Sequence, residues 1–571
     1  MSLTHVQDRM SGYNLDRGSQ TMKTSIDRES FLETLRLSAP LLDDDECPAA
    51  ERESEKEYAV PYKALRGVYC HYLALGWLNG IAISTAFAYC YYQQDGSANT
   101  CTALPSFFQL AWSFKFLIGA FQDATPMWGA LHRAPYVLGG WLCTVGLGAF
   151  LAVFADRLPM LGYAGVVCLL EFFMVTADTA CDALVVGLTK AEGESIRGTI
   201  LANAYTCRFT AAMLSSAAIA GLYDGPKQGG RMAFSLSLPT WWAIGVAPAA
   251  LFLLSGTFHT IRDAERALPP PEERPSILGA FSQFRECLKR PAAHRVGLAL
   301  FLITSLSLVT NSASNAAAIQ WFNYSNLQYG VDNTASYVTL TIVLQLLKKY
   351  ALQSDWRVLF GSSIFGMQIF YGCFLLVVWL CWARNGWFYV FLNIDNQVAY
   401  DVTFFLSVIM VPELVEPGLE GVTYGAFTTL TNAAQNVAGA VSVQLLGIWT
   451  VSNAALRRDD AASRWAVTKL QLTCCAIGFC ALLCTPLLPS QKADCARLRG
   501  GPSSTAAANF VLVLIIAGMV YGLAMAILPV IPQTSCLQLV GGAGCDAPDD
   551  DAGAHSLADD DDGDAAYCGR R

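Results

Sequence analysis

Charged side chains are scarce in this sequence, because Asp, Glu, Lys and Arg make up only 15% of its 571 residues. A soluble chain usually carries about a quarter. The charges gather in the two tails, as in DDDE at 43–46 and DDDD at 559–562, and in a central loop, with long uncharged runs between them. This distribution excludes a water-soluble core of this length and predicts an all-α polytopic membrane protein.

Histidine is rarer still, with six in the chain, and the sequence shows no nucleotide-binding loop, no metal-ligand spacing and no recognisable Ser/His/Asp set. These absences argue against an enzyme, and they give no reason to expect a cofactor, a metal ion or a nucleic-acid partner. The nineteen cysteines are scattered mostly through apolar segments, where we expect them to act as small packing residues. No cleavable signal peptide is expected, and residues 1–60 are predicted to form a disordered cytoplasmic tail.

Apolar segments long enough to cross a bilayer core of about 30 Å as helices recur along the rest of the chain. They predict an N-terminal lobe of six helices (61–262), a basic, proline-rich cytoplasmic loop (263–294) and a C-terminal lobe of six helices (295–488). A last region, 489–571, adds one more helix and an acidic tail. The expected spans are 67–91, 104–122, 134–154, 159–187, 198–222, 239–260, 295–322, 332–351, 356–382, 387–411, 420–450, 464–488 and 506–532.

The distribution of basic residues gives this topology an orientation. With a cytoplasmic N-terminus, most Lys and Arg fall on cytoplasmic segments, as the positive-inside rule requires, and only Arg457, Arg458 and Arg464 form a notable exception. The loop at 92–103 and the C-terminal tail are then expected outside. On that side Asn323 is a glycosylation candidate in an Asn-Tyr-Ser triplet. Tail cysteines 536, 545 and 568 can form disulfides there.

Ionisable residues also occur inside the predicted spans, where a charge costs about 2.5–3.5 kcal/mol even on lenient scales. Lys469 is close enough to a helix end to reach the interface, whereas Lys115 and Arg208 lie deeper. Acidic and amide residues of other spans are their possible partners: Glu171, Asp178 and Asp182 on one helix face, Asp395 and Asp401, and Asn311, Asn315, Gln320, Asn432, Gln435, Asn436 and Gln444. Each of them can be a structural pair between helices, but as a set they predict the polar lining of a substrate and proton pathway.

A second pattern lies where the second span ends. Gly119 and Asp123 give G-x-x-x-D, with Arg133 following as a counter-charge, in a six-plus-six layout. This resembles the signature of the major facilitator transporters and implies that Asp123 belongs to a cytoplasmic gate, in which the glycine lets a neighbouring helix approach. Glu416 and Glu420 near the start of the eleventh span are expected to join this gate, whereas Glu413 is expected to be a solvated loop charge.

Three stretches sharpen the resemblance. WSFKFLIGAFQD (112–123), DTACDALVVGLTKAE (178–192) and LVEPGLEGVTYGAFTTLTNAAQNVAG (414–439) are similar to motifs of the folate–biopterin transporter family, in matching spans, so the resemblance covers about residues 60–490. Phe116 stands where that family has proline, Gly187 where it has an acid, and one arginine precedes Pro135–Tyr136 where it often has several. The departures bear on the substrate more than on the fold.

The resemblance implies a secondary carrier for folate- or pterin-like solutes, coupled to H⁺. Lys115 or Arg208 is then expected to meet a substrate carboxylate, and Asp178 or Asp182 to bind a pterin edge or to carry a proton. Trp112, Phe114 and Tyr205 can stack on a flat ring. The alternatives are a carrier of the same fold for a nucleoside-like or S-adenosylmethionine-like metabolite, and a membrane receptor or scaffold. Both the plasma membrane and an organelle membrane fit the sequence.

Overall fold

The computed structural model describes residues 62–539, except 95–97, 128–130, 132, 194–195, 229–231, 268–275, 323, 351, 416–418, 450, 452–455, 457, 532, 535 and 538. The described residues fold almost entirely into helices, and no β-strand occurs among them. The expected all-α fold is therefore confirmed. Asn323 and Glu416 lie outside the described residues, as do Cys545 and Cys568, and the side chain of Asp395 is also not described.

The first lobe contains the helices that precede residue 255. They are α3 (Tyr62–Ala88), α4 (Ala98–Phe108), α5 (Lys115–Ala124), α6 (Ala134–Phe154), α7 (Met160–Lys190), α8 (Thr199–Leu222) and α9 (Leu238–Leu254). Helix α3 packs on α8 and α9, and α6 packs on α7 and α9. A 3-10 helix, Gln109–Phe114, joins α4 to α5 in the second span.

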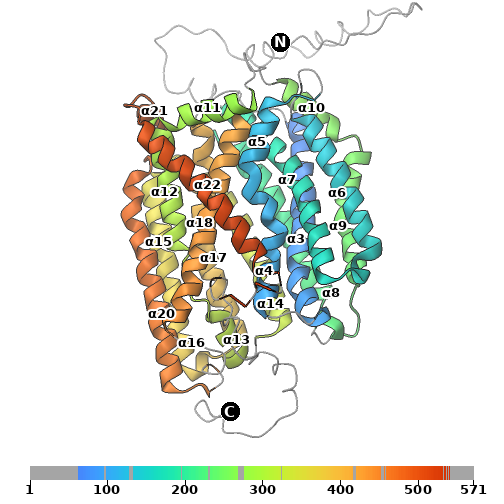
Figure 1. Cartoon of the computed structure of the whole chain (residues 1–571), viewed down its shortest axis with the longest axis vertical. Coiled ribbons are helices and arrows are strands. Elements are labelled where there is room, and N and C mark those ends of the chain that lie inside the picture. The colour runs from blue at the N-terminus through green and yellow to red at the C-terminus, as the bar shows by residue number, and fades with distance from the viewer. Residues whose placement is uncertain are drawn as a thin grey trace, which may run out of the picture. The chain divides into compact units, whose positions relative to one another are not determined.

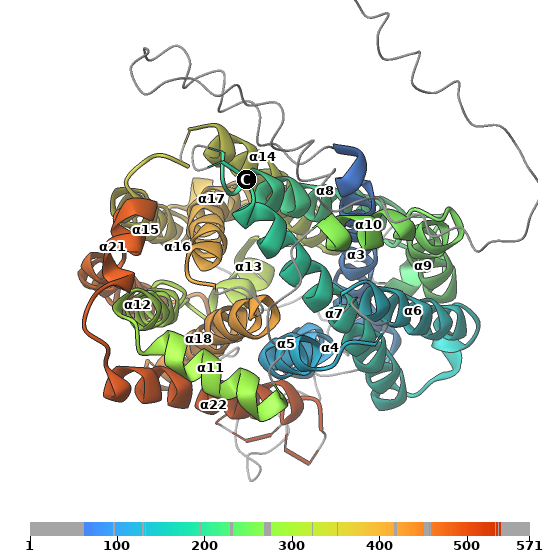
Figure 2. The same ribbon diagram turned by 90° about the horizontal axis from the view of Figure 1, so that it is seen from above.

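The second lobe follows the central connection. It contains α12 (Pro291–Ser307), α13 (Ser314–Phe322), α14 (Asn326–Tyr350), α15 (Trp356–Gly372), α16 (Phe374–Trp379), α17 (Gly386–Met410), α18 (Glu420–Ile448) and α20 (Ala461–Cys480), with α21 (Lys492–Arg499) and α22 (Thr505–Ile527) after it. Seen from above, the helices up to α9 and those from α12 to α20 occupy two sides of the bundle (Figure 2). The lobes meet where α8 packs on α14 and α5 on α18.

The apolar character of the helices varies with their place in the bundle. Among the described residues, six helical stretches are both long and apolar enough to cross a membrane: 104–124, 134–157, 160–190, 356–379, 461–487 and 505–527. Helices α3, α8, α14, α17 and α18 have 24–29 residues each. At 1.5 Å per residue such helices are about 36 Å or longer, enough to span, but they carry more polar side chains. Several of those side chains face the space between the lobes rather than lipid.

The seventh span, expected as one helix over 295–322, is broken. Helix α12 ends at Ser307 and α13 begins at Ser314. Polar side chains take up the freed backbone groups: the Ser442 hydroxyl accepts from Thr310 N at 2.8 Å, and Asn311 Oδ1 accepts from Ala313 N at 3.0 Å. The expectation of an unbroken helix was wrong. The length of an apolar run does not reveal where side chains replace the hydrogen bonds of the helix backbone.

The central connection is also more structured than the expected loop. Helix α9 ends at Leu254, six residues before the predicted end of the sixth span, and the chain bends by 56° into α10 (Phe258–Ala267). Gly256 takes φ +69° in this bend, a backbone conformation open to glycine. Helix α11 (Ile277–Leu288) then packs Phe281 and Phe284 on Phe116 of α5. Figure 1 shows α10 and α11 at one end of the bundle, called the gate end below.

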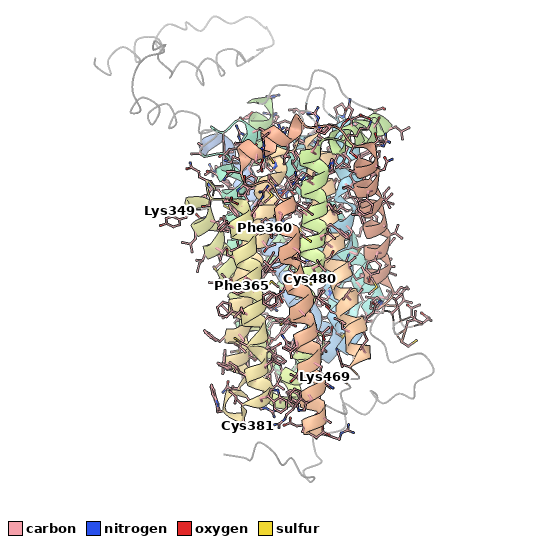
Figure 3. The ribbon with its side chains drawn as sticks, turned by 90° about the vertical axis from the view of Figure 1, so that its left-hand side faces the viewer. Lys349, Phe360, Phe365, Cys381, Lys469 and Cys480 are labelled. Atoms are coloured by element: carbon pink, nitrogen blue, oxygen red, sulfur yellow. A yellow bond between two sulfur atoms is a disulfide. The ribbon has the colours of Figure 1, made fainter. Side chains whose placement is uncertain are left out.

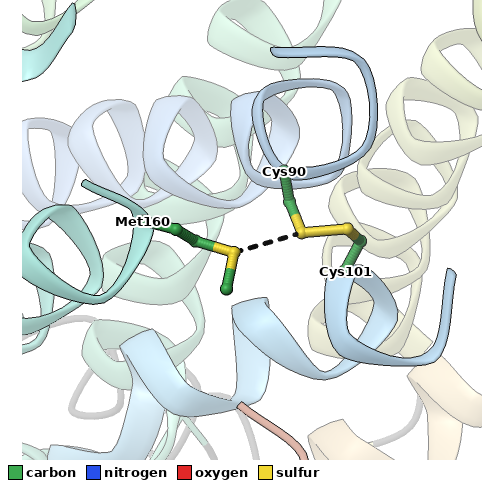
Figure 4. Close-up of a disulfide and its surroundings, with 3 residues drawn as sticks. All are labelled: Cys90, Cys101 and Met160. Carbon is green, nitrogen blue, oxygen red and sulfur yellow. Dashed lines mark hydrogen bonds between the residues drawn. A yellow bond between two sulfur atoms is a disulfide. The ribbon is translucent and has the colours of Figure 1, made fainter. Parts of the chain in front are cut away.

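The opposite end carries a disulfide between Cys90 and Cys101, and is called the disulfide end. Figure 4 shows Met160 of α7 beside the bridge, with its thioether sulfur 3.8 Å from Cys90 Sγ. Cys381 and Cys536 are also disulfide-bonded. Four of the cysteines therefore do more than pack, and disulfides fit an oxidising compartment on this side.

Lys469, which was expected to snorkel to the membrane interface, lies toward the disulfide end of α20 (Figure 3). Its ammonium lies 5.6 Å from the centre of the Trp449 ring, a cation–π distance. Arg464, part of the exception to the basic-residue rule, binds Asp459 at 2.9 Å, and Arg384 binds the same carboxylate. Arg464 thus has an acidic partner on this side, which it shares with Arg384.

Candidate functional site

A central cavity of about 470 Å³ lies between the lobes. Its wall combines polar and aromatic side chains from both lobes and from α22, among them Trp112, Lys115, Arg208, Tyr337, Tyr400, Asn432 and Gln435. Along the second span it runs from Ser106, near the disulfide, to Lys115. Beyond Lys115 the lobes are in direct contact at Gly119 and Asp123. The cavity is thus closed toward the gate end.

Lys115 is the first residue of α5, where the 3-10 helix of the second span gives way to α-helix. Its Nζ lies 2.5 Å from Asp178 Oδ2 and 2.6 Å from Asp182 Oδ2. The two acids are one turn apart on α7, so both can reach the same ammonium. Lys115 is 2% exposed and both carboxylates are fully buried. Three charges are thus withdrawn from lipid into one cluster.

Two residues of α3, His71 and Tyr72, also contact the acids of this cluster. The Tyr72 hydroxyl donates to Asp182 Oδ1. Trp141 Nε1 donates to His71 Nδ1 at 2.8 Å, and His71 Nε2 faces Asp178 Oδ1 at 3.9 Å. Sequence reasoning missed both residues, although an adjacent His-Tyr pair inside a long apolar span was a usable signal.

Arg208 of α8 stands on the cavity side of these acids. Its Nη1 lies 4.0 Å from Asp178 Oδ1, and its guanidinium carbon lies 4.4 Å from the centre of the Trp112 ring. Lys115 Nζ is 4.7 Å from the same ring. The cations line the cavity, while Asp178 and Asp182 lie behind them. The surface offered to a solute is therefore cationic and aromatic.

The other predicted pathway residues have different positions. Glu171 is buried and accepts from Trp112 Nε1 at 3.2 Å and from Asn79 Nδ2 at 3.4 Å, so it holds the indole rather than facing the cavity. Asp401 is buried and accepts from Gln397 Nε2 at 2.8 Å. Asn432 lines the cavity and donates to the Trp112 carbonyl at 3.3 Å.

The three aromatic residues predicted to stack on a flat solute have different positions. Trp112 and Tyr205 line the cavity, whereas Phe114 packs against the apolar cluster around Phe116, away from the cations. The Tyr205 hydroxyl meets that of Tyr424 at 2.6 Å. This contact joins α8 of one lobe to α18 of the other, next to the ion cluster.

The G-x-x-x-D motif forms the contact that closes the gate end. Asp123 pairs with Arg133 at 2.6 Å and accepts from the backbone amides of Gly421 (3.2 Å) and Val422 (2.6 Å). Those amides open α18, so the carboxylate caps the positive end of a helix in the other lobe. Arg133 also reaches Glu420 at 3.4 Å.

Further tethers join the lobes at the same end. Arg197 pairs with Glu413 at 3.3 Å, and Lys492 Nζ donates to the Arg197 carbonyl at 3.0 Å. Lys190 donates to the Val415 carbonyl. The expectation that Glu413 is a solvated loop charge was wrong. The residue is only 9% exposed, because the loop after α7 folds over it with a matching arginine.

The turn that carries Arg197 is closed by Glu192, which gives a pH-dependent prediction. Its carboxylate accepts from Gly198 N (2.7 Å) and Ile200 N (2.9 Å), and burial raises its pKa to about 7. The folded protein then binds more protons than the unfolded chain between about pH 4.3 and 7, so the free energy of unfolding should fall as pH rises through that window.

Glu192→Gln removes this titration and should flatten the dependence. Thermal unfolding in detergent at pH 5 and pH 7.5 measures it in the parent chain and in the variant. An unchanged pH dependence in the variant would show that Glu192 does not titrate in this range.

Comparison with solved structures supports the fold. The crystal structure of the human organic anion transporter MFSD10 (TETRAN) aligns with a TM-score of 0.51 at 16% sequence identity, covering 74% of this chain and all of that one. The nucleoside transporter NupG aligns with a TM-score of 0.49 at 13% identity, covering 74% of this chain and 99% of that one. No protein-family model and no curated protein matches the sequence. The helical fold of this chain is thus shared with the MFSD10 structure.

Proposed function

We propose that this protein is a secondary active transporter that moves a small organic anion by alternating access. The observation that carries the proposal is the cavity between two helical lobes, walled by Lys115 and Arg208 and closed at one end by the contact at Asp123. A buried charged cavity is costly in a membrane protein, and it is retained where a solute must cross. A receptor or scaffold needs no such wall.

A folate- or pterin-like solute suits this wall best. The Arg208 guanidinium can bind a carboxylate through two parallel hydrogen bonds. Trp112 offers a ring face for a flat heterocycle beside both cations. The three sequence motifs that resemble folate–biopterin transporters supply Lys115, Asp178, Asp182 and Tyr424 to this same region. A sulfonium compound is disfavoured, since the acids lie behind cations.

The ion cluster also suggests how a proton is coupled to transport. Lys115 and Arg208 together balance the two carboxylates in the described conformation. A proton on either Asp178 or Asp182 leaves the two cations with one carboxylate, so one positive charge becomes available to an anion in the cavity. Proton and anion then bind together, as symport requires. Release of both on the other side restores the original pairing.

The test is uptake of labelled folate, biopterin and S-adenosylmethionine by cells that express the chain, with an empty-vector control. We expect folate or biopterin to accumulate faster at acidic external pH and S-adenosylmethionine not to accumulate. Arg208→Gln at equal surface level should abolish the difference from the vector. Uptake that is indifferent to Arg208 would contradict a role for this cavity.

Arg208 should act through its shape as well as its charge. Arg208→Lys keeps the charge but loses the planar contact with Trp112 and the two-point grip on a carboxylate. We expect KM to rise about tenfold, corresponding to about 1.4 kcal/mol, with a smaller change in maximal rate. Concentration-dependent uptake measures both. A KM equal to that of the parent chain would remove Arg208 from the binding wall.

A further inference from the structure

Helix α22 follows the second lobe and runs obliquely past α18 toward α4 (Figure 1). It begins near the gate end, where Ser504 N donates to the Lys289 carbonyl at 2.9 Å. It packs mainly on α18 of the second lobe and less on α11 and α12, and it also contacts α4 and the 3-10 helix Gln109–Phe114 of the first lobe. A helix that follows the second lobe could have stayed on the outer side of that lobe, and this one instead bridges the lobes.

Two glycines allow α22 to approach the bundle closely. A Cβ on Gly518 would lie 2.2 Å from Ala433 Cβ, and one on Gly522 would lie 2.5 Å from the Asn436 amide nitrogen and 3.5 Å from Ser113 Oγ. Gly522 thus sits against side chains of both lobes at once. Small residues spaced by four are the usual means by which membrane helices pack this tightly.

This close packing makes part of α22 a wall of the central cavity. Gly522, Met525 and Ala526 line it, next to Asn436 and Ser113. Ala526 is 6% exposed, whereas Val520 and Val513 on the same helix are 64% and 60% exposed. One side of α22 therefore faces lipid, and a short stretch near its end faces the substrate space.

We infer that α22 is a wall of the substrate cavity and sets the size of the solute that it accepts. This rests on the proposed function. Its lining residues carry no charge and no side-chain hydrogen-bond donor, so they suit the apolar or bulky part of a solute, while Lys115 and Arg208 hold its anionic part. A larger side chain at Ala526 should therefore exclude large solutes before small ones.

Thiol labelling tests the wall without any assumption about the substrate. Met525→Cys should react with a charged, membrane-impermeant methanethiosulfonate, because a thiolate forms in water. Val520→Cys on the lipid side is the matched control and should stay at the background of the parent chain. Equal labelling of the two variants would overturn the inference, whatever the protein transports.

Size selection is tested by uptake. Ala526→Phe should lower folate uptake about tenfold or more while changing biopterin uptake much less, since folate carries an additional p-aminobenzoyl ring between its pterin and its anionic glutamate. Val520→Phe adds similar bulk toward lipid and should change neither. If Ala526→Phe and Val520→Phe behave alike while Arg208→Gln still abolishes uptake, the inference fails and the proposed function stands. If no anion is transported but Met525→Cys labels selectively, the wall stands and the proposed function fails.

Discussion

Lys115→Met is expected to lower uptake by about two orders of magnitude while the protein still reaches the membrane. The substitution keeps an apolar stem but removes the ammonium that lies within 2.6 Å of two buried carboxylates. Removing one partner of a buried ion pair costs about 3 kcal/mol or more, and each 1.4 kcal/mol is about tenfold. Insertion should survive, because the helix becomes more apolar. Initial uptake rates at matched surface level measure the effect.

Two companion variants separate pairing from general damage. Lys115→Arg keeps a positive charge in a broader shape and should retain part of the transport. Adding Asp182→Asn to Lys115→Met should cost little beyond the single change, because interacting residues are not additive. Full uptake by Lys115→Met would show that this ammonium has no role in the pathway.

Gly119→Val is expected to abolish transport through a different step, closure of the gate end. A Cβ at this position would lie 2.2 Å from the Gly421 carbonyl oxygen and 2.5 Å from its carbon. Both are backbone atoms of α18, so no side-chain rotation relieves the contact, and the lobes must move apart. The Asp123 bonds to the Gly421 and Val422 amides should then break as well. We expect uptake to fall by about tenfold to a hundredfold.

Gly139 on α6 provides the matched control. Nothing lies within 4 Å of a Cβ built on it, so Gly139→Val should transport like the parent chain. A cysteine placed at Thr125, beside the gate, would report the opening directly by its labelling with an aqueous reagent. Normal transport and unchanged labelling in Gly119→Val would contradict a tight closure at this glycine.

The sequence predicted the features that depend on hydrophobicity and charge. Long apolar runs are sufficient to predict membrane helices, and a lysine in such a run requires a partner, so the association of Lys115 with acids of α7 followed from the cost of a lone charge. The spacing of Asp178 and Asp182 placed both on one helix face. The gate motif likewise brought Asp123 and Arg133 together because their charges are opposite.

Other features depend on three-dimensional proximity that no local pattern encodes. His71 and Tyr72 are more than a hundred residues from the acids that they face, and nothing in the sequence pairs them. The break before α13 arises from Ser442, a residue of another helix. The position of α22 against Ala433 and Asn436 follows from glycines whose contacts lie elsewhere in the chain.

The most direct test of the account is counterflow in proteoliposomes that contain the purified chain. Vesicles loaded with unlabelled folate or biopterin should accumulate the labelled compound transiently, and the accumulation should be lost with Lys115→Met and kept with Gly139→Val. Vesicles that show no counterflow with either compound, or the same counterflow with Lys115→Met as with the parent chain, would contradict the claim that this cationic cavity carries an organic anion across the membrane.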